Sequence, residues 1–319
     1  MNNMCRAYLS PWKDPESDQY VTIGRCNLGA VSLNICLIIA IAKKEFGKEW
    51  REHFWDLLEY RLEVIRNFFK KRYDMIRHTK CSTNPMAFCQ GGFYKGNKNP
   101  DDEIGDLVQY MTASFGFIGL NEATILWNGK EISEDNSFAK EFLNFLQDHL
   151  NKYKKEDDYL YAIYATPAES YQSTAVKAYE KFSGDTQFGE YFTNGFHCHV
   201  ADDINPFEKQ DKEVECFHLS PGGHIGYGRI DYPNNLEAIK QTYLRAMELG
   251  YYYGVNFDAG FCQDCGEQFN NCTTECPKCH SKNIVVIDRV TGYLGYSNIN
   301  GKTRFNDGLL ANLKDRKSM

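Results

Sequence analysis

The chain has 319 residues, and its 36 lysines and arginines stand against 43 aspartates and glutamates, for a formal net charge of −7. No dense run of lysine and arginine is present, which argues against binding to the phosphate backbone of nucleic acids. The most apolar run, Ala30 to Ala42, is too short to cross a bilayer, and no charged-then-apolar leader opens the chain. We therefore expect a soluble, cytoplasmic protein with neither a membrane nor a nucleic-acid partner.

The twelve cysteines point to a reducing compartment. Disulfide frameworks belong to short secreted chains, and four of these cysteines have metal-binding spacing instead. Cys5 lies in a segment closed by Pro11 and Pro15, which predicts a loop. Asn27 lies in a glycine-bounded turn before a strand-like run at 30–34, where ordinary turn chemistry explains an asparagine.

Strand and helix patterns alternate through the middle of the chain. A long amphipathic helix is predicted from Glu49 to about Arg77, because apolar residues recur there at spacings of three and four. A buried strand and short helix follow at 114–120, an amphipathic helix spans 138–150, and a strand covers 160–165. This alternation predicts an α/β sheet or barrel.

The segment 166–169 has the residues of a helix capping box. Thr166 would be the N-cap, Pro167 the first helical residue, and Glu169 the reciprocal acceptor. Helix capping alone explains all three residues, and a catalytic role for Glu169 would require the helix N-terminus to face a cavity.

Two further segments between 196 and 249 are informative. Residues 196–200 alternate as a strand would, which places His197 and His199 on one face. Without a third ligand nearby we interpret them as core or cavity histidines. The glycine-rich run 221–228 predicts close backbone approach. A helix capped by Asn234 or Asn235 should then run to about Leu249 with an apolar stripe facing inward: Leu236, Ile239, Tyr243 and Met247.

The strongest motif is a pair of Cys-x-x-Cys knuckles, Cys262 with Cys265 and Cys276 with Cys279. Their spacing predicts one tetrahedral zinc site. Because all four ligands come from the protein, the zinc has no open coordination position and should be structural. Metal binding would supply folding free energy to a module too short to have a core of its own.

The run Arg289–Gly295 follows this array and holds two glycines around an aromatic residue and a leucine. A turn after a strand explains such glycines. A second chemistry also demands glycine, because an α-carbon without a side chain can become planar and delocalise an unpaired electron over its flanking amides.

Because it follows the four-cysteine array, the run Arg289–Gly295 closely resembles the C-terminal end of anaerobic ribonucleoside-triphosphate reductases, which are glycyl radical enzymes. The resemblance recurs in Cys5–Trp12, Gly24–Gly29, Tyr164–Glu169, Asn205–Lys209, Gly222–His224 and Arg304–Asn306.

The resemblance implies roles for individual residues. Gly292 would store the radical, and Cys5 would form the thiyl radical that takes hydrogen from the ribose 3′ carbon. Glu169 and Tyr164 would lie at the substrate end of the site. Asn27 would lie near formate, the external reductant of some members.

The reductant is not decided by the resemblance. Two departures from the family pattern bear on the role of Asn27: the family's methionine–glycine pair before the cysteine is Asn3-Met4 here, and Cys26 and Cys36 are additional thiols close to Asn27 in sequence. A dithiol reductant therefore stays open beside formate.

The fold implied by the resemblance is the C-terminal half of a ten-stranded barrel at 1–258, followed by a zinc-binding glycyl radical module at 259–319. The substrate would be a ribonucleoside triphosphate. The expected partners are a radical-SAM iron–sulfur activating protein, the missing N-terminal half as a separate chain, and a second copy in a homodimer of the assembled enzyme. Two alternatives are a zinc-ribbon interaction protein and a spare-part protein that repairs a damaged radical module on another enzyme.

Overall fold

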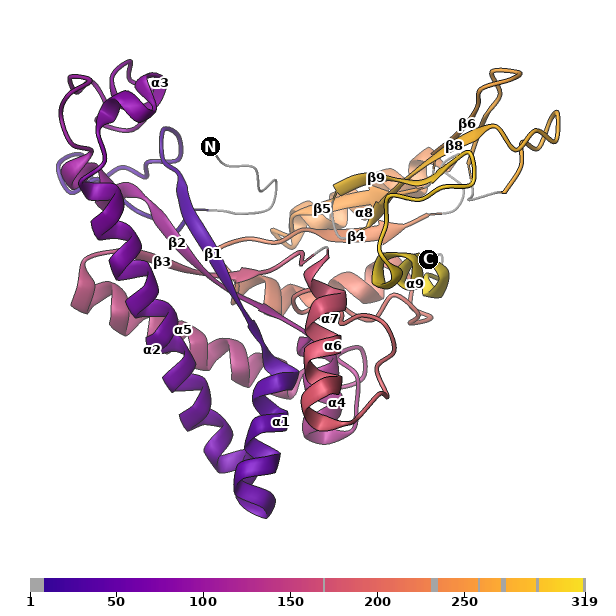
Figure 1. Cartoon of the computed structure of the whole chain (residues 1–319), viewed down its shortest axis with the longest axis horizontal. Helices are drawn as coiled ribbons and strands as arrows, with labels where there is room; N and C mark the ends of the chain where they lie inside the picture. The colour runs from indigo at the N-terminus through magenta and orange to yellow at the C-terminus, as the bar shows by residue number, and fades with distance from the viewer. Residues whose placement is uncertain are drawn as a thin grey trace.

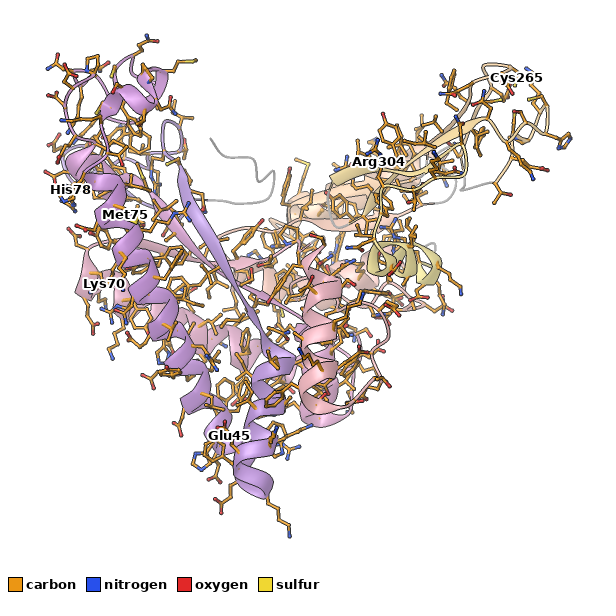
Figure 2. The ribbon with its side chains drawn as sticks, in the orientation of Figure 1. Glu45, Lys70, Met75, His78, Cys265 and Arg304 are labelled. Atoms are coloured by element: carbon orange, nitrogen blue, oxygen red, sulfur yellow. The ribbon has the colours of Figure 1, made fainter. Side chains whose placement is uncertain are left out.

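The computed structural model describes residues 9–168, 170–230, 235–257, 259–270, 274–290 and 293–317. The chain forms two arms that diverge from a shared base (Figure 1). One arm carries the first three strands and the helices on them. The other ends in a small antiparallel sheet. Figure 2 shows Lys70 and Met75 along the long helix of the first arm and Cys265 at the outer end of the second.

The first sheet is parallel, in the order β1-β2-β3, and consists of β1 (Asn27–Asn34), β2 (Thr112–Ile118) and β3 (Leu160–Ala165). Every residue of β2 is buried, as expected for the central strand of a parallel sheet with covered faces. These strands confirm those predicted at 30–34, 114–120 and 160–165. Because parallel strands need crossover connections, the intervening segments form helices.

Helices pack on the side of this sheet that carries Phe115. The ring centroid of Phe69 lies 5.4 Å from that of Phe115, which ties the long helix to the sheet. The predicted helix at 49–77 is confirmed as α2, although Phe68, one of the apolar residues that recur at helical spacing, is 47% exposed. The helices of this arm are α1 (Ile35–Phe46), α2 (Trp50–Arg77), α3 (Pro85–Phe88), α4 (Leu120–Asn128), α5 (Ser137–Asp157) and α6 (Tyr171–Ser183), with short 3₁₀ turns η1 (Gly47–Glu49), η2 (Cys81–Thr83) and η3 (Gly105–Tyr110).

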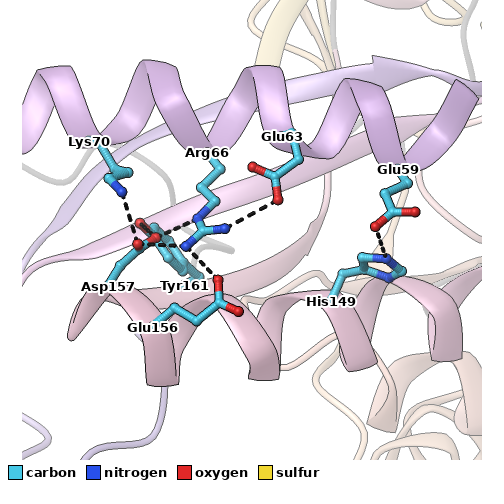
Figure 3. Close-up of polar contacts among 8 residues, drawn as sticks. All are labelled: Glu59, Glu63, Arg66, Lys70, His149, Glu156, Asp157 and Tyr161. Carbon is cyan, nitrogen blue, oxygen red and sulfur yellow. Dashed lines mark hydrogen bonds and ion pairs between the residues drawn. The ribbon is translucent and has the colours of Figure 1, made fainter.

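An ion-pair network joins α2 to the end of α5 (Figure 3). Arg66 donates to both carboxylate oxygens of Asp157, each at 2.7 Å. Lys70 and the hydroxyl of Tyr161 also donate to this carboxylate, at 3.1 and 3.0 Å. Asp157 is the last residue of α5, so the network holds the turn between α5 and β3 against α2.

A second, two-stranded parallel sheet follows along the chain. It consists of β4 (Gly226–Arg229) and β5 (Tyr253–Asn256), flanked by α7 (Pro206–His218) and α8 (Leu236–Glu248). The segment before β4 lies against β3, because Gly222 N donates to Ile163 O at 2.6 Å and Ala165 N to Gly223 O at 3.2 Å. A Cβ at Gly222 would collide with that Ile163 carbonyl. The predicted close backbone approach is therefore confirmed here.

The predicted orientation of α8 is wrong. Its cap is as expected, since the Asn235 side chain accepts from Ala238 N at 3.0 Å. The apolar stripe faces outward, however: Leu236 is 73% and Met247 75% exposed. The helix packs instead through Thr242 and Ala246, and Gln210 of α7 donates to the Thr242 carbonyl at 3.0 Å.

The second arm is an antiparallel sheet in the order β7-β6-β8-β9, with its own small core of Cys262, Phe269, Cys276, Ile284 and Val286. Its strands are β6 (Ala259–Cys262), β7 (Gln268–Phe269), β8 (Ile284–Val290) and β9 (Tyr293–Ile299). The terminal helix α9 (Asp307–Asp315) returns toward the base of the molecule, where Lys317 N donates to Val200 O at 3.0 Å.

The described residues confirm an α/β fold with a separate four-cysteine unit. They contain five parallel strands in two sheets. No helix among them is long and apolar enough to span a membrane.

Candidate functional site

The face of the first sheet opposite Phe115 carries small and polar side chains. Asn27 Nδ2 donates to Ser114 Oγ at 2.5 Å, and Asn27 Oδ1 accepts from Gly29 N at 2.7 Å. Tyr164 pairs in register with Gly116, two residues after Ser114 on β2. Residues two apart on a strand share a face. The structure therefore brings Asn27 and Tyr164, both predicted site residues, to one side of the sheet.

A hydroxyl pair closes the carboxyl end of this face. Ser32 Oγ and Thr166 Oγ1 are 2.6 Å apart. They meet above Gly116, where any side chain would collide with both oxygens. This contact explains why Thr166 is not the N-cap of a helix that begins at Pro167, as predicted; Glu169, the other member of the predicted capping box, lies outside the described residues. The hydroxyl of Thr166 bonds to Ser32, and α6 begins at Tyr171 with no side-chain cap.

Three predicted site residues, Cys5, Glu169 and Gly292, lie outside the described residues. The strands that flank position 292 are described. They form the β8–β9 hairpin, in which Val290 pairs with Tyr293.

The backbone that enters this hairpin is held by two side chains. The carbonyl of Arg289 accepts from Asn256 Nδ2 at 2.9 Å and from an Nη of Arg316 at 2.7 Å. The guanidinium of Arg289 donates to the Tyr227 hydroxyl at 3.3 Å and lies 5.5 Å from the centre of that ring. These contacts fasten the turn end of the hairpin to β4, β5 and the residue that follows α9.

A buried carboxylate organises the base of the site. Glu213 Oε1 accepts from Lys209 Nζ at 2.5 Å and from Cys198 N at 2.9 Å. Its Oε2 lies 3.0 Å from His197 Nδ1 and accepts from the Tyr251 hydroxyl. Although burial alone would raise the pKa of Glu213, the charges and hydrogen bonds of Lys209 and His197 hold it well below the usual range.

This carboxylate also explains why the strand predicted at 196–200 is absent. The backbone at Cys198 bonds to Glu213 and not to a neighbouring strand. His197 lines a cavity, whereas His199 stacks on Tyr191 with ring centroids 5.7 Å apart. The two histidines thus have separate partners, which agrees with their interpretation as core and cavity residues.

The four predicted metal ligands converge. The Sγ atoms of Cys262, Cys265, Cys276 and Cys279 all lie within 4.8 Å of one another. Two of the sulfur–sulfur distances are 3.6 Å. A tetrahedral ion with metal–sulfur bonds of about 2.3 Å would hold its sulfurs about 3.8 Å apart, so the cluster fits such an ion. It is the one such group that the described residues form.

Sequence patterns missed the residues that hold the hairpin and the hydroxyls on the sheet. Asn256 and Arg316 are isolated polar residues, and nothing in their spacing indicates a shared carbonyl. Ser32 and Ser114 could have been identified from the sequence, although they were not. A polar residue at alternate positions of an otherwise apolar strand indicates a face that is not packed against helices.

Comparisons with known proteins agree over nearly the whole chain. The family model for anaerobic ribonucleoside-triphosphate reductase matches residues 1–318. The curated protein of that name from Enterobacteria phage T4 is 30% identical over 312 residues, which cover 93% of this chain and 50% of the phage protein. The Escherichia coli (strain K12) protein is also 30% identical over 312 residues, 91% of this chain and 42% of its own length. The chain thus spans about half the length of the curated relatives it matches.

Solved structures show the same fold. An anaerobic ribonucleotide reductase superimposes with a TM-score of 0.66 at 17% identity, over 91% of this chain and 44% of that chain. The Thermotoga maritima anaerobic ribonucleotide reductase with glycerol in the active site gives a TM-score of 0.64 at 18% identity, over 84% and 41%. At these identities the likeness concerns the fold alone.

Proposed function

Because the chain belongs to the anaerobic ribonucleoside-triphosphate reductase family, we propose that it forms the C-terminal part of a catalytic unit that reduces ribonucleoside triphosphates to 2′-deoxyribonucleoside triphosphates. The observation that carries this proposal is the family match over residues 1–318. The shared face of Asn27 and Tyr164 supports it, as does the anchored hairpin around position 292.

In the proposed reaction Gly292 stores the radical and passes it to Cys5, whose thiyl radical removes hydrogen from the ribose 3′ carbon. The 2′ hydroxyl then leaves as water, and Glu169 assists proton transfer at the 3′ oxygen. Formate or a dithiol supplies the two electrons of the reduction, and Cys5 returns hydrogen to the 3′ carbon. Asn27 would lie on the reductant side and Tyr164 on the substrate side.

We propose that the four-cysteine cluster binds zinc and that residues 259–319 form the module presenting Gly292. Thiolate ligation would stabilise the small sheet β6–β9, whose described core is only five residues. Residues 1–258 would form half of a ten-stranded barrel. In support, the strands of each parallel sheet, β1-β2-β3 and β4-β5, lie side by side in chain order, and within the described part β1 pairs with β2 alone.

The proposed partners follow from this assignment. A radical-SAM iron–sulfur activating protein would install the radical on Gly292. A segment corresponding to the N-terminal half of the relatives, expected as a separate chain, would complete the barrel, and the assembled enzyme would form a homodimer.

Electron paramagnetic resonance tests the assignment of Gly292. Under strict anaerobiosis, with the family's activating protein and S-adenosylmethionine, the chain should give a doublet split by the one remaining α-hydrogen. Protein labelled with α-deuterated glycine should give a collapsed signal, and Gly292→Ala should give none. Tyr293→Phe should keep the doublet, which distinguishes the glycyl radical from a tyrosyl radical. A doublet that survives in Gly292→Ala would refute the assignment.

A further inference from the structure

A pocket of about 80 Å³ lies beside Arg289, near the turn end of the β8–β9 hairpin. This is several times the volume of about 10–15 Å³ that admits one water. Its walls come from the end of β3, residues 193–200, α7, β4, β5, β8 and the C-terminal tail. The pocket therefore lies between the segment that leads to Glu169 and the strand that leads to Gly292, and it has room for a group of several heavy atoms.

The walls of this pocket are strongly cationic. Arg229, Arg289 and Arg316 all line it, with the amide side chains of Asn256 and Asn312. No aspartate or glutamate is among the described residues that line it. Three guanidinium groups around one small space repel each other, and such an arrangement is stabilised when an anion occupies the space.

Arg229 is the critical group because it is buried and incompletely bonded. It is 8% exposed. Its Nη1 donates to the Val200 carbonyl, whereas its Nη2 has no hydrogen-bond partner among the residues that the structure describes. Burial and the nearby charge of Arg316 lower the pKa of Arg229 to about 10, so the group stays charged at neutral pH. A buried, charged donor without an acceptor is costly unless a ligand provides one.

The neighbouring carboxylates do not provide that acceptor. Glu213 and Asp202 both attract Arg229 electrostatically, but neither lines the pocket. Glu213 is already bonded to Lys209, His197, Tyr251 and the backbone of Cys198. Asp202 interacts instead with the carboxyl of Glu131, whose pKa is raised partly for that reason.

We propose that this pocket binds a phosphate-type oxyanion, with Arg229, Arg289 and Arg316 as its ligands. Guanidinium groups suit this role because their planar N–H donors match the oxygens of phosphate, often in bidentate fashion. The oxyanion is either a phosphate group of a nucleotide or free inorganic phosphate. Only the nucleotide source rests on the proposed function. The same anion would also hold the turn end of the hairpin, since Arg289 and Arg316 line the pocket and also take part in the contacts at that end.

Phosphate binding by the full chain tests the pocket directly. Thermal unfolding is followed while inorganic phosphate replaces chloride at constant ionic strength. The screening of protein charges by salt is then the same in all samples, so a change in melting temperature reports phosphate binding. Phosphate should raise the melting temperature of the wild type with a saturable dependence. Arg229→Gln and Arg316→Gln should each weaken phosphate affinity at least tenfold. If the buried Arg229→Gln variant does not fold, the phosphate affinity of Arg316→Gln, at a half-buried position, still tests the proposal.

Arg245→Gln is the matched control, because Arg245 pairs with Asp211 on the protein surface and does not line the pocket. It should leave phosphate affinity unchanged. The proposal is overturned if phosphate and chloride act alike on the wild type, or if Arg245→Gln weakens binding as much as Arg316→Gln.

Competition separates the two sources of the oxyanion. Displacement of phosphate by a ribonucleoside triphosphate, but not by the corresponding nucleoside, supports the nucleotide source. Phosphate retained in the presence of the triphosphate supports a site for the free anion. These measurements need no radical, so saturable phosphate binding in a chain that never forms the Gly292 radical would uphold the pocket while refuting the proposed function.

Discussion

At the residue scale, Asp157 shows how one buried carboxylate can stabilise a junction between elements. Its side chain is 3% exposed and is bonded by Arg66, Lys70 and Tyr161 (Figure 3). Burial alone would raise the pKa of Asp157, but these hydrogen bonds lower it to about 2. A carboxylate with a depressed pKa stabilises the fold above its unfolded pKa of about 4, and this contribution is lost as the pH falls through about 2.

We expect Asp157→Ala to lower the free energy of unfolding by about 3 kcal/mol, because it leaves Arg66 without its main partner in a buried setting. The control is Asp106→Ala, which removes an 87% exposed partner of Arg77 and should cost less than about 1 kcal/mol. Urea denaturation at neutral pH measures both. The free energy of unfolding of Asp157→Ala should also fall less steeply than that of the wild type as the pH drops below 4. Equal costs for the two variants would contradict this account.

Glu131 should have the opposite effect on pH dependence. Burial, together with the adjacent carboxyl of Asp202, raises its pKa to about 7. Between its unfolded pKa of about 4.5 and pH 7 the native state then holds more protons than the unfolded state, so stability falls as the pH rises. We expect Glu131→Gln to flatten this decline by about 1 kcal/mol, a modest value because the half-exposed group is screened by solvent. Denaturation midpoints at pH 4.5, 6 and 7.5 measure it, with the exposed Glu237→Gln as control.

At the element scale, hydrophobic periodicity identified helices well but did not always identify the face that packs. It correctly placed α2 and the buried face of α5, because these long helices cover a sheet whose apolar side chains match theirs. It failed for α8, where Thr242 and Ala246 make the contact and the large apolar residues point away. Close packing between helices can favour small residues, and a periodicity argument weighs only large ones.

Capping signals were also ambiguous without the tertiary contacts. Thr166–Glu169 and Asn205–Glu208 both have the residues of a capping box. The second forms one, because Asn205 Oδ1 accepts from Glu208 N at 3.0 Å and Glu208 Oε2 accepts from Asn205 N at 3.1 Å. At the first, a contact with Ser32, far away in sequence, decides the outcome. The metal cluster was predictable because its ligand spacing is set by local geometry alone.

The sheet β6–β9 should depend on its metal. Its five-residue core includes two of the cysteines, so removal of the ion exposes or repels the groups that hold it together. We expect one zinc per chain by mass spectrometry. Cys276→Ser changes a buried ligand and should release that zinc and unfold the sheet. Hydrogen exchange measures the unfolding, because the amides of β6 and β8 should exchange faster.

Cys89→Ser is the matched control for this variant, because Cys89 is a half-buried thiol outside the cluster. It should keep the zinc and the exchange protection of the sheet. Full zinc retention in a variant with all four ligands changed to serine would disprove the assignment of the site.

At the scale of the whole molecule, the arrangement of strands leaves an open edge. Five parallel strands run from β1 to β5, and within the described part the outer edge of β1 has no strand beside it. Exposed strand edges recruit other chains, and radical intermediates need a site closed to water. The polar face with Asn27 and Tyr164 would require a further wall to enclose a nucleotide. We therefore expect the chain to act as part of a larger assembly.

We expect the 319-residue chain, supplied with the activating protein, a ribonucleoside triphosphate and formate or a dithiol, to form the Gly292 radical without producing deoxynucleotides. Adding a polypeptide that corresponds to the N-terminal half of the relatives should start turnover, because it supplies the second wall of the cavity.

In this assembly Cys5→Ser should reduce product to background and leave the paramagnetic doublet intact, since Cys5 acts after Gly292. Cys89→Ser should retain both signals. Product is measured by chromatography and the radical by paramagnetic resonance in the same samples. Multiple turnovers by the chain alone would show that its own residues already enclose the site.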